Sequence, residues 1–217
     1  RYVSAEQVKR KEHLHRSVTE LKAAGTSRMA SYWVEAAGWR SDDVRVGLEM
    51  ASNYRGGVIA DPADLKRCDT ILGAVHHLQA LEQDPPDLGR AAEEYLGMVR
   101  ALLRAGARVL AHPFRVFRWS RYKLDPPATL FDAVVQLLQE HGAAAELNSH
   151  KNEPIPAFVV QCLDRGIPLT LGSDAHHLAE VGYLFPQIEL LHRLGGKVRA
   201  VWPGRPIIEQ LGGSAWG

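Results

Sequence analysis

Residues 167–177 have the sequence Ile-Pro-Leu-Thr-Leu-Gly-Ser-Asp-Ala-His-His. The apolar run at 167–171 predicts a buried strand, and Asp174 and His176 follow it two residues apart. Because side chains alternate along an extended chain, Asp174 and His176 should point the same way, into the space above a parallel sheet. Proteins of the α/β class hold their chemistry there, and an Asp with a His is a ligand pair for zinc, manganese or iron.

Runs that predict strands alternate with runs that predict helices along the rest of the chain. The expected strands are 44–49, 70–76, 108–112, 143–148, 167–171 and 197–202. The expected helices are 5–23, 28–38, a short one after Pro62, 87–105, 127–141, 154–165 and 184–194. Strand–helix alternation of this kind predicts a parallel sheet or barrel with right-handed crossovers.

Composition narrows the class of protein. With 217 residues and a net charge of +1, the chain can form one domain with a sizeable core, and its charge gives no case for a nucleic-acid or membrane partner. No window approaches the roughly 18 consecutive apolar residues of a membrane span, and no signal peptide is evident at the polar start of the chain. Cys68 and Cys162 are isolated cysteines, which is typical of thiols in a reducing cytoplasm.

Four of the expected strands end on residues that bind metals. These residues are Glu49, His76, His112, and the pair Asp174 and His176. One histidine at a strand end is more often structural than a ligand, but parallel strands bring all of these ends to one face. Three imidazoles and two carboxylates form a mixed nitrogen and oxygen set that suits zinc, manganese or iron, often as two or more ions.

The chain resembles the polymerase and histidinol phosphatase (PHP) superfamily of metal-dependent phosphoesterases, and most closely its histidinol-phosphatase-like branch. The resemblance covers about 41–202, and its motifs stand in the family's order. The matching phrases are Val-Gly-Leu-Glu at 46–49, Leu-Gly-Ala-Val-His at 72–76, Ala-His-Pro at 111–113, Glu-Leu-Asn at 146–148, Thr-Leu-Gly-Ser-Asp-Ala-His at 170–176 and Val-Gly at 181–182.

This resemblance implies an α/β fold, a distorted (β/α)7 TIM-like barrel with two or three divalent metal ions at the carboxyl ends of its strands. By the same analogy Glu49 bridges two ions, while His76 and His112 complete the shell of one of them. Asp174 serves a second ion and His176 a third. The whole chain is then one PHP-like barrel domain, with a helical part at 1–40, the barrel core at 41–205 and a tail at 206–217.

The chain departs from the family at its start. The family opens with a strand that carries His-x-His and a second strand that ends in a Thr-Asp-His-like phrase, and no such opening strand is evident here. The barrel is therefore expected to lack its first one or two strands, so that a preceding segment or a second chain completes it, or it stays open. His13 and His15 are either a relic of the second motif, with Glu12-His13 in its place, or exposed helix residues.

The resemblance implies hydrolysis of a small phosphomonoester by metal-activated water. Arg115 and Arg118 follow the strand end at His112, where they either pair with the phosphate or are ordinary surface arginines. His150 is a candidate proton donor to the leaving group. Asn148 could bind a ligand or brace a metal-binding histidine, and Trp119 could wall the substrate pocket or simply pack.

Two other functions are compatible with this sequence. A degenerate PHP module would bind metal without catalysis, which the lack of the opening His-x-His strand favours. An amidohydrolase-type metal hydrolase shares the late Asp and the histidine-rich strand ends, but it requires a bridging Lys or an opening His-x-His, and neither is evident.

Overall fold

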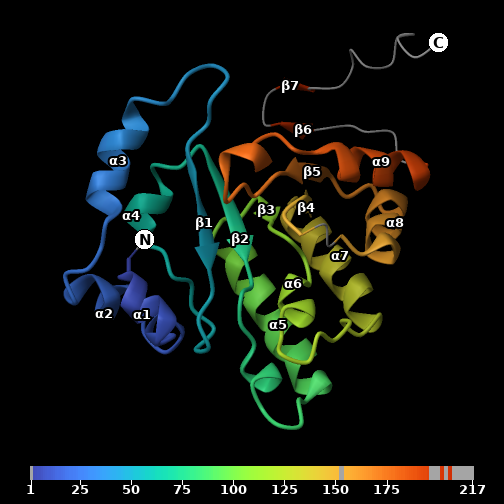
Figure 1. Cartoon of the computed structure of the whole chain (residues 1–217), viewed down its shortest axis with the longest axis horizontal. Helices are drawn as coiled ribbons and strands as arrows, with labels where there is room; N and C mark the ends of the chain where they lie inside the picture. The colour runs from blue at the N-terminus through green and yellow to red at the C-terminus, as the bar shows by residue number, and fades with distance from the viewer. Residues whose placement is uncertain (1, 152–153, 196–200, 203–204, 207–217) are drawn as a thin grey trace.

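The computed structural model describes residues 2–151, 154–195, 201–202 and 205–206 (Figure 1). Its centre is a five-stranded sheet in which every strand is parallel to its neighbours and pairs with the next strand along the chain. The strands are β1 (Gly47–Ala51), β2 (Thr70–Ala74), β3 (Val109–Leu110), β4 (Ala144–Asn148) and β5 (Leu169–Gly172). The expected alternation of parallel strands and helices is confirmed.

Each connection between successive strands contains at least one α-helix. The connecting helices are α4 (Pro62–Leu65), α5 (Leu88–Arg104), α7 (Thr129–His141) and α8 (Pro156–Asp164). The helix α5 packs against α7, and α7 packs against α8. A connection between neighbouring parallel strands returns along the sheet, so its helix packs back onto the sheet.

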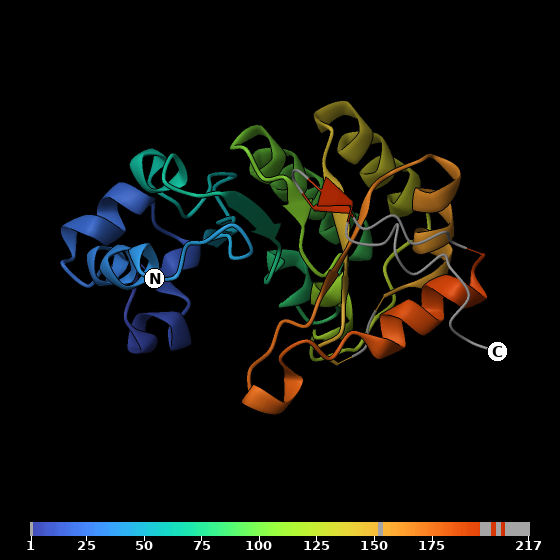
Figure 2. The same cartoon turned by 90° about the horizontal axis from the view of Figure 1, so that it is seen from above.

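The sheet has two edges within the described residues. The strand β1 pairs only with β2 in this sheet, and β5 pairs only with β4. In the described part of the chain the sheet is therefore open, and closure into a barrel stays a prediction. The views in Figures 1 and 2 show the N-terminal helices beside β1, at the opposite side of the molecule from α8.

The helix expected at 5–23 is instead three short elements. Lys11 adopts a left-handed conformation (φ 56°), which interrupts the first helix. Ser17 then starts a new helix with a capping box, in which its side chain and that of Glu20 satisfy each other's backbone N–H groups. The three elements are α1 (Ala5–Lys9), the 3-10 helix η1 (Glu12–Leu14) and α2 (Val18–Ala23).

The next helix, α3 (Met29–Ala37), agrees with the expected 28–38 and helps to attach the N-terminal part to the sheet. Asp64 in α4 accepts hydrogen bonds from Tyr2 (Oη to Oδ2, 2.7 Å) and from Trp33 (Nε1 to Oδ1, 2.6 Å). The hydroxyl of Tyr32 donates to the carbonyl of Gly47 at 2.5 Å. Side chains from the start of the chain and from α3 thus meet the first crossover and the first strand.

The strand β1 begins three residues later than expected and ends two residues later, at Ala51, so Glu49 lies within the strand rather than at its end. Asp69 explains the shift, because its carboxylate accepts the N–H of Val46 at 2.8 Å and its own N–H donates to the carbonyl of Val46 at 2.8 Å. The strands β2 and β3 end earlier than expected, and His76 and His112 lie two residues beyond them.

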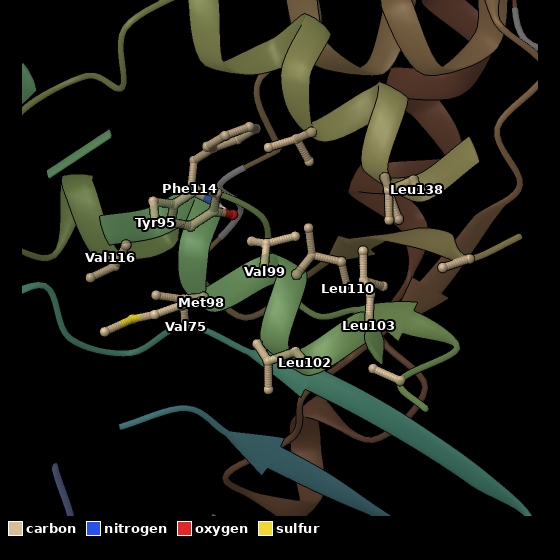
Figure 3. Close-up of a cluster of buried hydrophobic side chains, with 14 of the residues drawn as sticks. Val75, Tyr95, Met98, Val99, Leu102, Leu103, Leu110, Phe114, Val116 and Leu138 are labelled. Carbon is tan, nitrogen blue, oxygen red and sulfur yellow. Dashed lines mark hydrogen bonds between the residues drawn. The ribbon is translucent and has the colours of Figure 1, made fainter. Parts of the chain in front are cut away.

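The core lies between the sheet and α5 and α7 (Figure 3). All four residues of the stripe expected on α5 are buried, namely Ala91, Tyr95, Met98 and Leu102. The ring of Tyr95 stacks on Phe114 with centroids 5.2 Å apart, and its hydroxyl accepts the N–H of Phe114 at 3.0 Å. Burying each such large apolar side chain contributes roughly 1.5–3 kcal/mol.

A short helix that follows the third strand, α6 (Arg115–Arg118), was not expected from the sequence. Two further 3-10 turns, η2 (Gln79–Leu81) and η3 (Leu178–Glu180), lie in loops that follow β2 and β5. Each of these elements is only three or four residues long, which is too short for an apolar period to show in the sequence.

The last expected helix is present as α9 (Phe185–Arg193), and Gly195 follows it with a left-handed φ of 71°. Of the strand expected at 197–202, residues 201–202 form β6 (Val201–Trp202), which pairs antiparallel with β7 (Arg205–Pro206). Residues 197–200 and the tail at 207–217 lie outside the described residues.

Cys162 is buried, Cys68 is partly buried, and both are free. In the described part of the chain, no helix has the length and apolar character needed to cross a membrane.

Removing the cap of the longest helix tests how far α5 supports the fold. The carboxylate of Asp87 accepts the N–H of Arg90 at 2.9 Å, and Asp87→Ala should lower the free energy of unfolding by about 1 kcal/mol because that N–H loses its acceptor. Urea denaturation measures the change. Glu93→Ala, at an exposed position on the same helix, should stay within about 0.5 kcal/mol of the unsubstituted chain, and an equal loss in both variants would contradict the capping role.

Candidate metal centre

Glu49, His76 and His112 come together at the carboxyl edge of the sheet, and one ligand atom from each lies within 4.8 Å of the others. The Nε2 atom of His76 is 3.2 Å from Oε1 of Glu49, and the Nε2 atom of His112 is 4.0 Å from Oε2 of the same carboxylate. The two imidazole rings are edge-on, with centroids 5.1 Å apart. Parallel pairing produces this cluster, because it sets β1, β2 and β3 side by side with their carboxyl ends together.

The spacing of these donors fits a single divalent ion. Ligands that bind zinc at about 2.0–2.2 Å in tetrahedral geometry stand roughly 3.3–3.6 Å from one another. The distances of 3.2 and 4.0 Å from the glutamate to the two histidines bracket that range. Two imidazoles and one carboxylate leave one tetrahedral position for water or substrate, as catalytic zinc sites do.

The protonation states also suit a metal centre. Burial, together with the charges of Arg115 and His76, lowers the pKa of His112 to about 4, so the ring is neutral at neutral pH. Desolvation raises the pKa of Glu49, but its contact with His76 outweighs this effect and holds that pKa below its ordinary value. Neutral imidazole and ionised carboxylate are the forms that bind metals.

Asp174 lies beside the cluster but is held by other groups. Its Oδ2 atom accepts hydrogen bonds from Nη1 of Arg115 at 2.7 Å and from Nδ2 of Asn148 at 3.2 Å. Burial raises the pKa of Asp174, and the Arg115 guanidinium outweighs this and holds the pKa below its usual value. The structure therefore brings Asp174 to the same edge of the sheet as an ionised carboxylate paired with an arginine.

His176 and His150 form the rim of the site. The side chain of His176 is 60% exposed and stacks on His150, with centroids 4.3 Å apart and an interplanar angle of 14°. The Nε2 atom of His176 is 3.5 Å from Oδ1 of Asp174, and Nδ1 of His150 is 3.4 Å from Oε2 of Glu180. Both histidines thus lie outside the cluster of Glu49, His76 and His112.

The two candidate arginines diverge. Arg115 is 6% exposed, and besides Asp174 it donates to the side-chain oxygen of Asn148 and to the carbonyl of His150. Arg118 forms an ion pair with Asp125 near the surface, with Nη2 3.0 Å from the carboxylate. Trp119 is 50% exposed, and the Cζ atom of Arg115 lies 5.2 Å from the centroid of its ring.

The sequence predicted no role for Glu146, yet this residue holds the backbone of His112 and the side chain of Asn148 in place. It is 7% exposed, and its Oε2 atom accepts the N–H of His112 at 2.8 Å and the side-chain N–H of Asn148 at 3.1 Å. Burial raises the pKa of Glu146, against the lowering effect of these two hydrogen bonds. A single acid in the wholly buried strand β4 is the sequence signal that could have found it.

His13 and His15 differ from each other. His15 is exposed and lies edge-on to Tyr54, with centroids 5.2 Å apart. His13 is partly buried and lies edge-on to His77 at 6.2 Å, and burial together with the charge of His76 lowers its pKa. The expectation of an exposed helix residue is therefore wrong for His13. This residue lies in η1, near His76 and His77, but it is not a member of the cluster of Glu49, His76 and His112.

Fold and site together define an α/β protein with a candidate divalent-metal centre at the carboxyl edge of a parallel sheet. Over 176 residues, 71% of this chain, the sequence is 27% identical to a protein of Deinococcus radiodurans named probable histidinol-phosphatase. The alignment covers 66% of that protein, so the chain spans just under two thirds of the length of this curated relative. No protein-family model matches the chain.

Metal binding should stabilise the chain. If the cluster binds zinc or manganese in the folded state only, a free metal concentration 100 times the Kd should raise the free energy of unfolding by about 2.7 kcal/mol. Thermal unfolding with and without a chelator measures this change. His112→Ala should abolish the shift, whereas His192→Ala, which removes an exposed histidine on α9, should retain it. A shift of equal size in His112→Ala would remove His112 from the metal centre.

Proposed function

We propose that this chain is a metal-dependent phosphoesterase that hydrolyses a small phosphomonoester, with histidinol phosphate as the first candidate substrate. The observation that carries the proposal is the cluster of Glu49, His76 and His112 at the carboxyl edge of the sheet. The similarity to a probable histidinol-phosphatase supports the reaction class and the substrate.

In this proposal Glu49, His76 and His112 hold one ion, with Asp174 and His176 serving one or two further ions, as zinc, manganese or iron. A bound ion of this kind supplies activated water and neutralises phosphoryl charge. Asp174 and Arg115 lie beside the cluster, and the phosphoryl group would bind between them and the ion. The exposed His176 and its stacked neighbour His150 lie beside Asp174.

The remaining candidate residues act on the substrate. Arg115 and Arg118 are proposed phosphate contacts, and the buried guanidinium of Arg115 has the firmer position because Asp174 and Asn148 orient it. His150 is proposed to give a proton to the leaving alkoxide. Its stacking on His176 and its contact with Glu180 support this role, since both orient the ring.

The proposal includes the rest of the barrel. The five parallel strands would be part of a distorted (β/α)7 barrel, closed by further strands between β1 and β5 that a preceding segment or a second chain supplies. The two sheet edges and the greater length of the relative support this arrangement. The free cysteines support a reducing cytoplasm as the place of action.

A second candidate function is a PHP-like module that binds one ion without catalysis. The observation that favours it is the geometry of Asp174, whose Oδ2 atom is paired with Arg115 and which stands outside the three-residue cluster. Elemental analysis separates the two functions, because the phosphoesterase should hold two or three ions per chain and the module one.

Phosphate release tests the leading proposal. With manganese or zinc present, the chain should hydrolyse histidinol phosphate and p-nitrophenyl phosphate. His112→Ala and Asp174→Ala should each lower kcat/KM at least about 100-fold, because even the loss of a residue that only supports a metal ligand costs about 10–100-fold. His192→Ala should retain the activity. Unchanged turnover in His112→Ala and Asp174→Ala would contradict the assignment of these residues to a catalytic metal site.

A further inference from the structure

Glu146 is an acid that the sheet buries beside the candidate metal centre without making it a member of the cluster. It lies in β4, and its carboxylate contacts the candidate ligand His112 and the neighbouring Asn148. One oxygen, Oε2, accepts both the backbone N–H of His112 at 2.8 Å and the side-chain N–H of Asn148 at 3.1 Å. These contacts reach 34 residues back along the chain and two residues forward, so this carboxylate connects two strand ends.

The neighbouring strand β5 leaves space for this carboxylate at Gly172. In the parallel register Asn148 pairs with Gly172. A Cβ atom built on Gly172 would lie 1.9 Å from Oε1 and 2.8 Å from Cδ of Glu146, both closer than real Cβ contacts. Since the φ of Gly172 is outside the left-handed range, the glycine is required for space rather than for its backbone freedom. Glu146 and Gly172 are therefore a matched pair.

The hydrogen bonds of Glu146 reach two residues with unusual backbone conformations. His112 has a φ of 31°, and the N–H group of this same residue is the one that Glu146 binds. Asp174 has a φ of 46°, and its carboxylate accepts a hydrogen bond from the same Asn148 nitrogen that donates to Glu146. Non-glycine residues persist in this region only where the surroundings hold them, and such positions gather at functional sites.

We propose that Glu146 is a positioning residue of the metal centre. Its buried carboxylate, admitted by Gly172, holds the backbone of His112 directly and the side chain of Asp174 through Asn148, so that both residues face the ion. The inference rests on the proposed function, because it requires a metal centre at His112. It assigns Glu146 no contact with metal or substrate.

Titration of the chain with Co²⁺, followed by its visible absorption, tests this role because the spectrum reports ligand geometry. Glu146→Ala should weaken Co²⁺ binding by about 10–100-fold and change the spectrum. Glu146→Gln keeps the size of the side chain, and its amide oxygen can accept from both His112 and Asn148, as Oε2 of Glu146 does. Its Co²⁺ affinity and spectrum should therefore stay close to those of the wild type.

Leu147→Ala is the matched control. Leu147 is 1% exposed and neighbours Glu146 in β4, where the alternation of side chains puts it on the other face of the sheet. This variant should lower the thermal midpoint while its Co²⁺ affinity and spectrum stay those of the wild type. A folded Glu146→Ala chain, shown by circular dichroism, that binds Co²⁺ as the wild type does would overturn the inference.

Gly172→Ala tests the matched pair from the other strand. It should weaken Co²⁺ binding as Glu146→Ala does, and the double variant Glu146→Asp with Gly172→Ala should recover part of the loss, because the shorter side chain vacates the space. Losses of affinity that simply add would contradict the pairing of Glu146 with Gly172.

A wild-type chain that binds no Co²⁺ overturns the proposed function and this inference together. Binding without phosphate release, with the variants weakened as expected, supports the positioning role and overturns only the proposed catalysis.

Discussion

The parallel pairing of β1 to β5 is the constraint on which the rest of the molecule depends. Because all five strands are parallel, every carboxyl end reaches the same edge, and residues 49, 76, 112 and 174 lie at or near that edge. The helices α5 and α7 then cover one face with apolar side chains. At the strand ends, buried polar groups need hydrogen-bond partners, and the hydrogen bonds around Asn148 and Arg115 supply them.

Local signals in the sequence predicted the elements that depend on local interactions. The helix α5 agrees with its expected range within one residue, because Asp87 caps it and its apolar stripe has a helical period. The N-terminal region was predicted less well, because a left-handed turn at Lys11 divides an otherwise periodic segment. The start of β1 depends on Asp69, which lies 23 residues beyond Val46, and no local pattern contains that contact.

The difference between local and long-range interactions also decides how much of the candidate metal centre could be predicted. The meeting of Glu49, His76 and His112 followed from strand order, since each lies at or near a carboxyl end. The pairing of Arg115 with Asp174 spans 59 residues and depends on the short helix α6, which has no period to detect. The role of Glu146 depends on the register of β5 beside β4, and only the three-dimensional arrangement shows that Gly172 leaves space for its carboxylate.

The sequential order of the strands also has a consequence for biosynthesis. A sheet whose neighbours in space are neighbours in the chain can assemble in the order of translation, because no strand waits for a later one to be inserted between earlier ones. The three residues of the cluster belong to the first three strands, whereas Glu146, Asn148 and Asp174 arrive with the fourth and fifth. On the ribosome, the candidate ligands Glu49, His76 and His112 therefore emerge before the residues that support them.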